Sequence, residues 1–252
     1  MRPHWPTLTI LGIALWLFTT TGGGDIFVSD MLGEAYDSQA EHFLRGDADV
    51  DGEAIRHEAM VVHGKARMYF GPFPALLRIP LNFFYPAGRG RWSRISVFGA
   101  AIVALCAFAG LIRNALAKSL LKPIAREWLE IVCLVAFAFA SPLLLLVGEA
   151  SIYNEAVIWG LAGSLAALFF AFRSRETSGL RLTYDLLAFS ISAGAALLAR
   201  VSFGFPLLIV VVLLATRVRP RHRARNLTAL LLPISVAAAF HLLLSYQRFG
   251  SA

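Results

Sequence analysis

Long apolar runs separated by short polar segments dominate the chain. The runs cover residues 5–21, 95–116, 128–147, 152–172 and 227–244. A bilayer core of roughly 30 Å is crossed by about 20 helical residues, and each run is close to that length. The pattern therefore predicts a series of membrane-spanning helices, which is typical of an all-α polytopic membrane protein.

A longer apolar stretch, residues 182–216, needs a different interpretation. Basic residues flank both of its ends, so both ends are expected on the same side of the membrane. Arg200 lies in its middle, and Gly204 and Pro206 interrupt a helix shortly afterwards. We expect two short helices, each with about 14 strongly apolar residues, that meet near the outer face with Arg200 at their junction.

The predicted topology has about seven transmembrane helices in a single transmembrane domain over residues 1–252. The N-terminus is expected in the cytoplasm. Because no small-residue cleavage site follows residues 5–21, we interpret this run as an uncleaved signal-anchor, with a cleaved signal peptide as the alternative. Residues 22–94 then form a long extracytoplasmic loop between spans one and two, with short helices expected over residues 36–44 and 54–62.

Composition and charge support this class of protein. Hydrophobic residues make up 58% of the chain and charged residues 15%, whereas a soluble domain carries about a quarter charged residues. Of 23 Lys and Arg residues, 13 lie at the N-terminus and around the loops at residues 113–126, 173–181 and 217–225, beside only four acidic residues. The positive-inside rule explains such clustering, so we expect membrane lipid and no nucleic acid as a partner.

The first outer loop is rich in acidic residues, most of which we expect to be solvated. Asp30, Glu34 and Asp37 differ because they come soon after the first span, where a short helix could hold them against the bilayer surface. A carboxylate there could take a proton from a hydroxyl nucleophile, or hold a divalent cation against a phosphate. These three residues are the catalytic candidates, and the identity of any cofactor or metal stays open.

Five further side chains are candidates for binding a substrate. Tyr69 and Arg78 belong to a segment rich in aromatic residues and proline, which indicates either an anchor in the headgroup layer or the lining of a lipid-substrate groove. Tyr153 and Glu155 lie at the outer end of a span, near the expected position of Arg200. Either Glu155 and Arg200 form an ion pair, or Arg200 grips a phosphate with its forked donors.

Several short motifs together resemble a known family. They are EAYDSQA at residues 34–40, LRGD at 44–47, FGPFP at 70–74, YNEA at 153–156 and YQRFGS at 246–251. In this combination the chain resembles the polyprenyl-phosphate-dependent glycosyltransferases of the GT-C fold. These include bacterial relatives of protein mannosyltransferases and the lipid A aminoarabinose transferase.

The resemblance implies a membrane glycosyltransferase in the bacterial inner membrane. Such an enzyme moves a hexosyl or pentosyl group from a polyprenyl-phosphate donor to an acceptor outside the membrane, with an acidic residue of the first outer loop as base or metal contact. The family commonly has Asp-Glu before a Tyr, where this chain has Gly33 and Glu34, so Asp30 or Asp37 would substitute. Family members also continue through more helices after a similar Arg-Phe-Gly-Ser segment, which implies a truncated chain.

Two other hypotheses stay open. The broken helices around Arg200 also suit the binding site of a transporter or of another lipid-handling membrane protein without covalent chemistry. Alternatively, the chain is an inactive fragment of the transferase. An acidic loop residue close to Arg200 would favour catalysis, because the chemistry needs both groups at one place.

Overall fold

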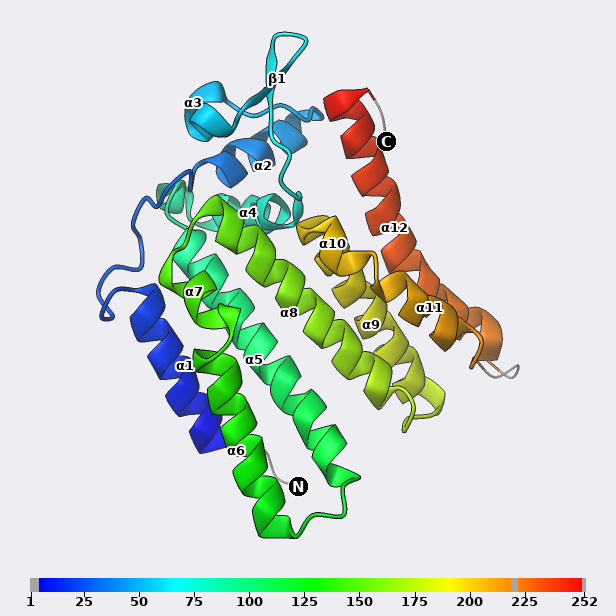
Figure 1. Ribbon diagram of the computed structural model, residues 1–252. Helices are drawn as coiled ribbons and strands as arrows, with labels where there is room; N and C mark the ends of the chain where they lie inside the picture. Colours follow the sequence, from blue (N-terminus) through cyan, green and yellow to red (C-terminus); the bar gives the residue numbers. More distant parts are fainter. Residues whose placement is uncertain (1–4, 219–221, 251–252) are drawn as a thin grey trace.

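Long apolar helices run side by side through most of the molecule (Figure 1), and the computed structural model describes residues 5–218 and 222–250. Neighbouring helices in the chain also pack together in space. In chain order the principal helices of the bundle are α1 (Trp5–Thr19), α5 (Ser93–Ala117), α6 (Pro123–Phe139), α7 (Pro142–Gly148), α8 (Ile152–Arg173), α9 (Gly179–Ala199) and α12 (Arg223–Phe249). The predicted all-α class is confirmed.

The long apolar helices are those of an integral membrane protein, but fewer of them than the predicted seven are long enough to span a bilayer. Among the described residues, α5, α8, α9 and α12 are long and apolar enough to cross a bilayer, and α6 and α7 together make a fifth span bent by 45°. The remaining two of the seven predicted spans are short. Helix α1 has 15 residues, and α10 (Val201–Gly204) with α11 (Leu207–Ala215) forms a broken segment.

The bend between α6 and α7 has a local cause. Pro142 cannot donate a backbone hydrogen bond, and it stands at the first position of α7. The Ser141 hydroxyl accepts a bond from the backbone N–H of Leu143 at 3.1 Å and donates to the carbonyl oxygen of Phe137 at 2.6 Å. Ser141 thus satisfies backbone groups on both sides of the break, as a buried helix end requires.

The break at Arg200 is confirmed, but the two helices beside it are not the equal pair that we expected. Helix α9 has 21 residues, and α11 has nine. Arg200 itself is extended, with φ −157° and ψ 124°. A Cβ atom on Gly204 would overlap the backbone of Leu197, so this glycine allows α10 to fold back against the last turn of α9.

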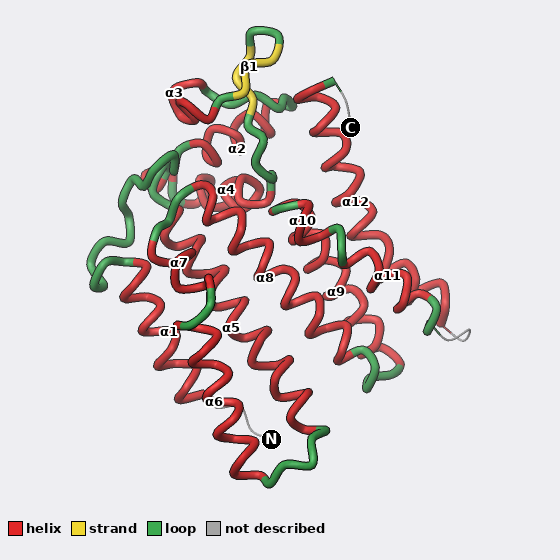
Figure 2. The backbone as a smooth tube through the Cα atoms, in the orientation of Figure 1, coloured by secondary structure: helices red, strands yellow, loops and turns green. Residues whose placement is uncertain are grey.

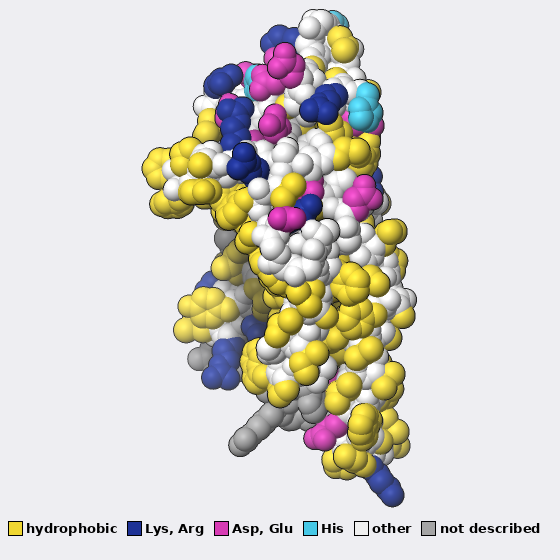
Figure 3. All heavy atoms as spheres, turned by 90° about the vertical axis from the view of Figure 1, so that its left-hand side faces the viewer, with side chains coloured by type: hydrophobic (Ala, Val, Ile, Leu, Met, Phe, Trp, Pro, Cys, Tyr) yellow, Lys and Arg dark blue, Asp and Glu magenta, His cyan; other side chains and the backbone are white. Residues whose placement is uncertain are grey.

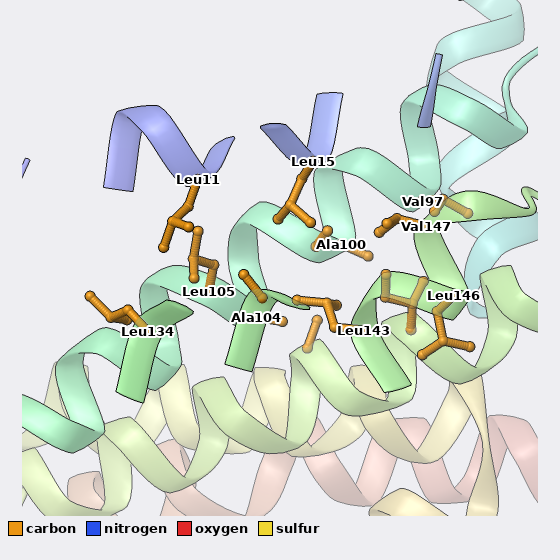
Figure 4. Packing of buried hydrophobic residues seen from close by; sticks show 14 of the residues in the cluster. Leu11, Leu15, Val97, Ala100, Ala104, Leu105, Leu134, Leu143, Leu146 and Val147 are labelled. Atoms are coloured by element: carbon orange, nitrogen blue, oxygen red, sulfur yellow. The ribbon is translucent and has the colours of Figure 1, made fainter. Parts of the chain in front are cut away.

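Small residues bring the central helices close together. A Cβ atom on Gly163 of α8 would lie 2.8 Å from the carbonyl oxygen of Ser192 in α9, and one on Gly194 of α9 would lie 3.0 Å from the Cβ atom of Ala237 in α12. Close backbone approach through such residues is the usual way in which membrane helices associate. On the other side of α8, leucine, valine and alanine side chains from α1, α5, α6 and α7 pack together in an apolar core (Figure 4).

Residues 20–92 cap one end of the bundle, which we call the loop end. They form α2 (Ala35–Arg45), α3 (Gly52–Ile55), a 3-10 turn at Arg56–Glu58, the antiparallel hairpin of β1 (Met60–Val62) and β2 (Lys65–Arg67), α4 (Phe73–Phe84) and a 3-10 turn at Pro86–Gly88 (Figure 2). The helix expected at residues 36–44 is confirmed as α2. It stops at Gly46, whose φ of +84° suits glycine.

The helix expected at residues 54–62 is wrong, because this segment contains the four-residue α3, a 3-10 turn and β1. Val61 and Val62 are β-branched and favour a strand, and Gly64 supplies the turn with φ +78°. Asp49 then fixes the hairpin through ion pairs with Lys65, at 2.8 Å, and Arg67. Local turn and strand preferences therefore outweigh helix formation here.

The surface reflects the same division. On the face shown in Figure 3, charged side chains gather at the loop end, and apolar side chains cover most of the helices below it. Exposed apolar residues along these helices include Ile13, Leu17, Val132 and Val135. A large apolar band of this kind is costly in water and suits contact with lipid.

Gly71, in the segment before α4, provides a test of this packing. A Cβ atom there would overlap the carbonyl oxygens of Leu198 and Ala199 at the end of α9. We predict that Gly71→Ala lowers the free energy of unfolding by about 1–3 kcal/mol, because backbone atoms cannot move aside easily. Thermal unfolding in detergent measures the change. Gly99→Ala is the control, since nothing lies within 4 Å of its Cβ position, and an equal loss in both variants would contradict the packing argument.

Candidate functional site

Four segments that are far apart in the sequence meet at the loop end. They are α2, α4, the beginning of α8 and the end of α12. Buried Tyr36, Phe70 and Ile152 belong to one apolar cluster, and the Tyr36 hydroxyl donates a hydrogen bond to the Ile152 carbonyl oxygen at 3.3 Å. The motifs at residues 34–40, 70–74 and 153–156 therefore contribute to one site.

The centre of this site is an ion pair between Arg78 of α4 and Glu155 of α8. Both side chains are 0% exposed, and one Arg78 Nη2 donates to both Glu155 oxygens, at 2.7 and 2.9 Å. Of the two alternatives for Glu155 and Arg200, the ion pair is not formed, because Glu155 pairs with Arg78. Pro72 and Pro74 place the start of α4 so that Arg78, one turn further on, lies over the first turn of α8.

Asp37 of α2 lies beside this pair. Its carboxylate is 3.8 Å from Arg78 Nε, and it accepts hydrogen bonds from the Asn82 amide at 2.7 Å and the Gly90 backbone N–H at 3.1 Å. Trp92 in turn donates to the Asn82 carbonyl oxygen at 2.8 Å. Burial raises the pKa of Asp37 above its usual value, and Arg78, Asn82 and Gly90 oppose that rise.

The other two acidic candidates lie in different surroundings. Asp30 forms an ion pair with Arg94 at 3.1 Å, at the edge of a cavity of about 130 Å³ that also includes Glu149 and Ser151. Glu34 is exposed at the start of α2. Its Cγ would be 2.7 Å from a Cβ atom on Gly90, so Glu34 and Asp37 lie on either side of the same loop. The three acids therefore do not share one pocket.

The backbone around Gly33 leaves little room for a side chain at this position. Gly33 is buried, and a Cβ atom on it would lie 3.0 Å from the carbonyl oxygen of Gly90 and 3.2 Å from that of Asp30. A side chain at this position would force the loop around Gly90 to move. The next residue, Glu34, is exposed and has room for its side chain.

Two further arginines lie on the α9–α12 side of the site. The buried Arg248, at the end of α12, donates from Nη1 to the Phe70 carbonyl oxygen at 3.0 Å, but its Nε and Nη2 have no hydrogen-bond partner within the described part of the chain. Arg200 is exposed, and in the same described residues its guanidinium makes no ion pair. Burial, followed by the charge of Glu155, raises the pKa of Tyr36, whereas the charges of Arg78, Arg200 and Arg248 lower it.

The aromatic candidates lie on the rim. Tyr69 donates a hydrogen bond to Glu58 at 2.7 Å, and the ring of Phe70 packs edge-on against Tyr153 at 5.1 Å. Burial, then the bond to Glu58, raises the pKa of Tyr69, and bonds from Tyr153 and Tyr69 lower the pKa of Glu58. Tyr69 and Tyr153 thus lie close together, on either side of Phe70.

The sequence analysis did not single out Asn82, Trp92, Gln39 or Arg248. Asn82 follows Arg78 by four residues, so helical spacing places both on one face of α4 and could have revealed it. Gln39 is 0% exposed, and neither of its amide atoms has a hydrogen-bond partner in the described residues. Gln39 follows Tyr36 by one turn of α2, but no feature of the sequence predicts its burial. Ser251 of the YQRFGS motif lies outside the described residues.

A divalent cation remains a prediction. Within residues 5–218 and 222–250, no group of three or more His, Cys, Asp or Glu side chains is arranged to hold a metal ion. No protein-family model matches the chain, and no match was found among curated proteins or solved structures. The geometry defines a buried, arginine-rich site at the end of an integral membrane protein.

The Arg78–Glu155 pair can be tested by a double-mutant cycle. We predict that Glu155→Leu alone lowers the free energy of unfolding by about 3–5 kcal/mol, because it leaves the buried Arg78 with only the more distant carboxylate of Asp37. Arg78→Met combined with Glu155→Leu should lose less than the sum of the single changes. Unfolding in mixed detergent measures each variant. The exposed pair of Lys118 and Glu176 is the control, for which Glu176→Gln should change stability by less than about 1 kcal/mol. Strict additivity at Arg78 and Glu155 would contradict the coupling.

Proposed function

We propose that this protein is a membrane glycosyltransferase that moves a sugar from a polyprenyl-phosphate donor to an acceptor on the extracytoplasmic side. The observation that carries the proposal is that guanidinium nitrogens beside Tyr36 have no hydrogen-bond acceptor among the described residues. Arg248 is 5% exposed and has two N–H-bearing nitrogens without partners in the described residues, and Arg200 has a free, exposed guanidinium. Buried donors of this kind are costly unless a ligand accepts their hydrogen bonds.

A phosphate is the ligand that this chemistry favours. Guanidinium groups bind phosphate through paired, charge-assisted hydrogen bonds, and both arginines act on Tyr36 electrostatically. Phe70 connects the two sides, because its carbonyl oxygen binds Arg248 while the neighbouring Gly71 packs on the helix end next to Arg200. The donor phosphate would bind near Arg200 and Arg248, where their charge stabilises the departing phosphate.

The acidic residues then have different roles. Glu34 is exposed and is free to accept a proton from an acceptor hydroxyl, so we assign it as the general base. Asp37 is buried and hydrogen-bonded, which suits a positioning residue for the loop around Gly90. Asp30 is engaged by Arg94, which leaves it less suited to accept a proton. Tyr69 and Tyr153 would contact the acceptor at the rim.

The proposal also includes an orientation and a location. Because 13 of the 23 basic residues lie near the N-terminus and in and around the segments at residues 113–126, 173–181 and 217–225 of the sequence, the positive-inside rule favours a cytoplasmic N-terminus. The loop end would then face outward in the bacterial inner membrane. Lipid-linked sugar donors could reach it laterally, since the helices below present apolar side chains to the bilayer.

A transfer assay tests the proposal. The full-length membrane protein is incubated in nanodiscs with radiolabelled polyprenyl-phosphate mannose or aminoarabinose, and labelled acceptor is measured. We predict that Glu34→Gln lowers kcat by about 10²–10⁴ with little change in donor affinity, because general base catalysis contributes that much. Arg200→Gln should instead weaken donor binding by about 10-fold or more, through loss of a charge-assisted contact.

Arg91→Gln is the matched control, because Arg91 is another exposed arginine of the loop end. Its kinetics should stay within about twofold of wild type. Saturable donor binding without transfer would instead favour the lipid-handling alternative. Neither binding nor transfer by the wild-type protein, or equal effects of Arg91→Gln and Arg200→Gln, would overturn the assignment.

A further inference from the structure

A second cavity lies at the end of the bundle opposite the loop end. It has a volume of about 520 Å³ and lies between the α8–α9 turn, α9, the end of α11 and the beginning of α12, which come together at the lower right of Figure 1. Arg175, Arg217 and His222 lie at its exposed rim, and Leu186 and Asn226 are buried in its wall. The cavity is thus cationic at its mouth and partly apolar inside.

An apolar groove continues from this cavity along the membrane-facing side of the bundle. It has a volume of about 100 Å³ and runs between α8 and α11, where Leu168, Phe172, Val210 and Leu213 line it. Arg175, Leu214 and Arg217 border both the groove and the cavity, so the two are continuous. A ligand could therefore place a charged group at the arginines and an apolar chain between the helices.

The charges at the rim are not neutralised from within the described part of the protein. Arg175 stacks on the ring of Phe172 at 4.9 Å, and neither it nor Arg217 forms an ion pair there. The nearby carboxylates are engaged elsewhere. Glu176 pairs with Lys118 at 2.7 Å. Asp185 pairs with Arg173 and accepts a hydrogen bond from Thr177 at 2.8 Å. The two arginines are thus available to an anion from outside the chain.

The short α11 gives the groove its membrane exposure. Its nine residues extend about 13.5 Å, less than half of the hydrocarbon core. Ile209, Val212 and Leu213 remain exposed along it. An acyl chain covers such a surface without bringing unpaired polar groups, and basic pockets between membrane helices suit acidic lipid headgroups.

We propose that the cavity and groove bind one anionic phospholipid. Its phosphate lies between Arg175 and Arg217, and an acyl chain follows the groove between α8 and α11. Asn226, whose amide oxygen accepts a hydrogen bond from the Thr183 hydroxyl at 2.6 Å, is a polar residue of the cavity wall and would face the lipid headgroup. This site is separate from the loop end and does not rest on the proposed transferase activity.

Lipid binding to the purified full chain tests the proposal. Dioleoyl-phosphatidylglycerol is titrated in detergent, bound lipid is counted by native mass spectrometry, and phosphatidylcholine with the same acyl chains is the comparison. We expect phosphatidylglycerol to bind about 10-fold more tightly, and the Arg175→Gln, Arg217→Gln double variant to lose this preference. Leu213→Gln should weaken phosphatidylglycerol binding by about two- to fivefold, through loss of apolar contact.

Arg181→Gln is the matched control, because Arg181 is exposed at the same end of the bundle and does not line the cavity. It should retain the preference for phosphatidylglycerol, and inorganic phosphate at millimolar concentration should not displace the lipid. Equal binding of the two lipids, or an unchanged preference in the double variant, would overturn the proposal. Displacement by inorganic phosphate would also overturn it, because the site would then bind a free anion.

Discussion

The buried ion pair of Arg78 and Glu155 is the constraint on which the loop end depends. Two charges without any solvent exposure are tolerated because Arg78 Nη2 donates to both oxygens of Glu155 and the carboxylate of Asp37 lies 3.8 Å from Arg78 Nε. Nε and Nη1 of Arg78 have no hydrogen-bond partner among the described residues, so the pair supplies most of the compensation for this buried charge. The pair fixes α4 across the first turn of α8. Asp37 then fastens α2 to α4 through Asn82, and to the loop before α5 through the Gly90 backbone. A long polar insertion thereby acquires a defined position on an apolar bundle, which hydrophobic contact alone would specify much less strictly.

Much of the architecture follows from the sequence pattern. The apolar runs locate every long helix, and glycine locates the end of α2 at Gly46. Lengths at the Arg200 break are less predictable, because α9 gains its full 21 residues by packing against α8 and α12. The hydropathy pattern of a sequence gives no information about such contacts between helices. The hairpin at residues 60–67 is hard to predict for a related reason. A short segment with two valines suits either a helix or a strand, and the ion pairs of Asp49 with the second strand stabilise the hairpin.

The candidate site was predicted in outline and corrected in its pairing. Asp37, Arg78 and Glu155 were candidates for separate reasons, and the structure brings them together, with Glu155 paired to an arginine of the loop end. Spacing within one helix can be read from sequence, whereas the choice between two arginines on different helices depends on the path of the chain. That choice leaves Arg200 without an ion pair among the described residues. For the same reason the sequence does not predict the contact of Arg248 with Phe70, because the two residues are 178 positions apart.

The unequal lengths of α9 and α11 have a mechanical consequence. Helices of 21 and nine residues differ by about 18 Å in length, so the hydrocarbon around α11 meets a shorter apolar helix than the hydrocarbon around α9. A bilayer accommodates a short apolar helix by thinning locally, at a cost that depends on its own thickness. Helix α11 is connected to Arg200 through the four residues of α10 and the turn at Phe205 and Pro206. We therefore expect the position of this guanidinium to depend on the thickness of the bilayer around α11.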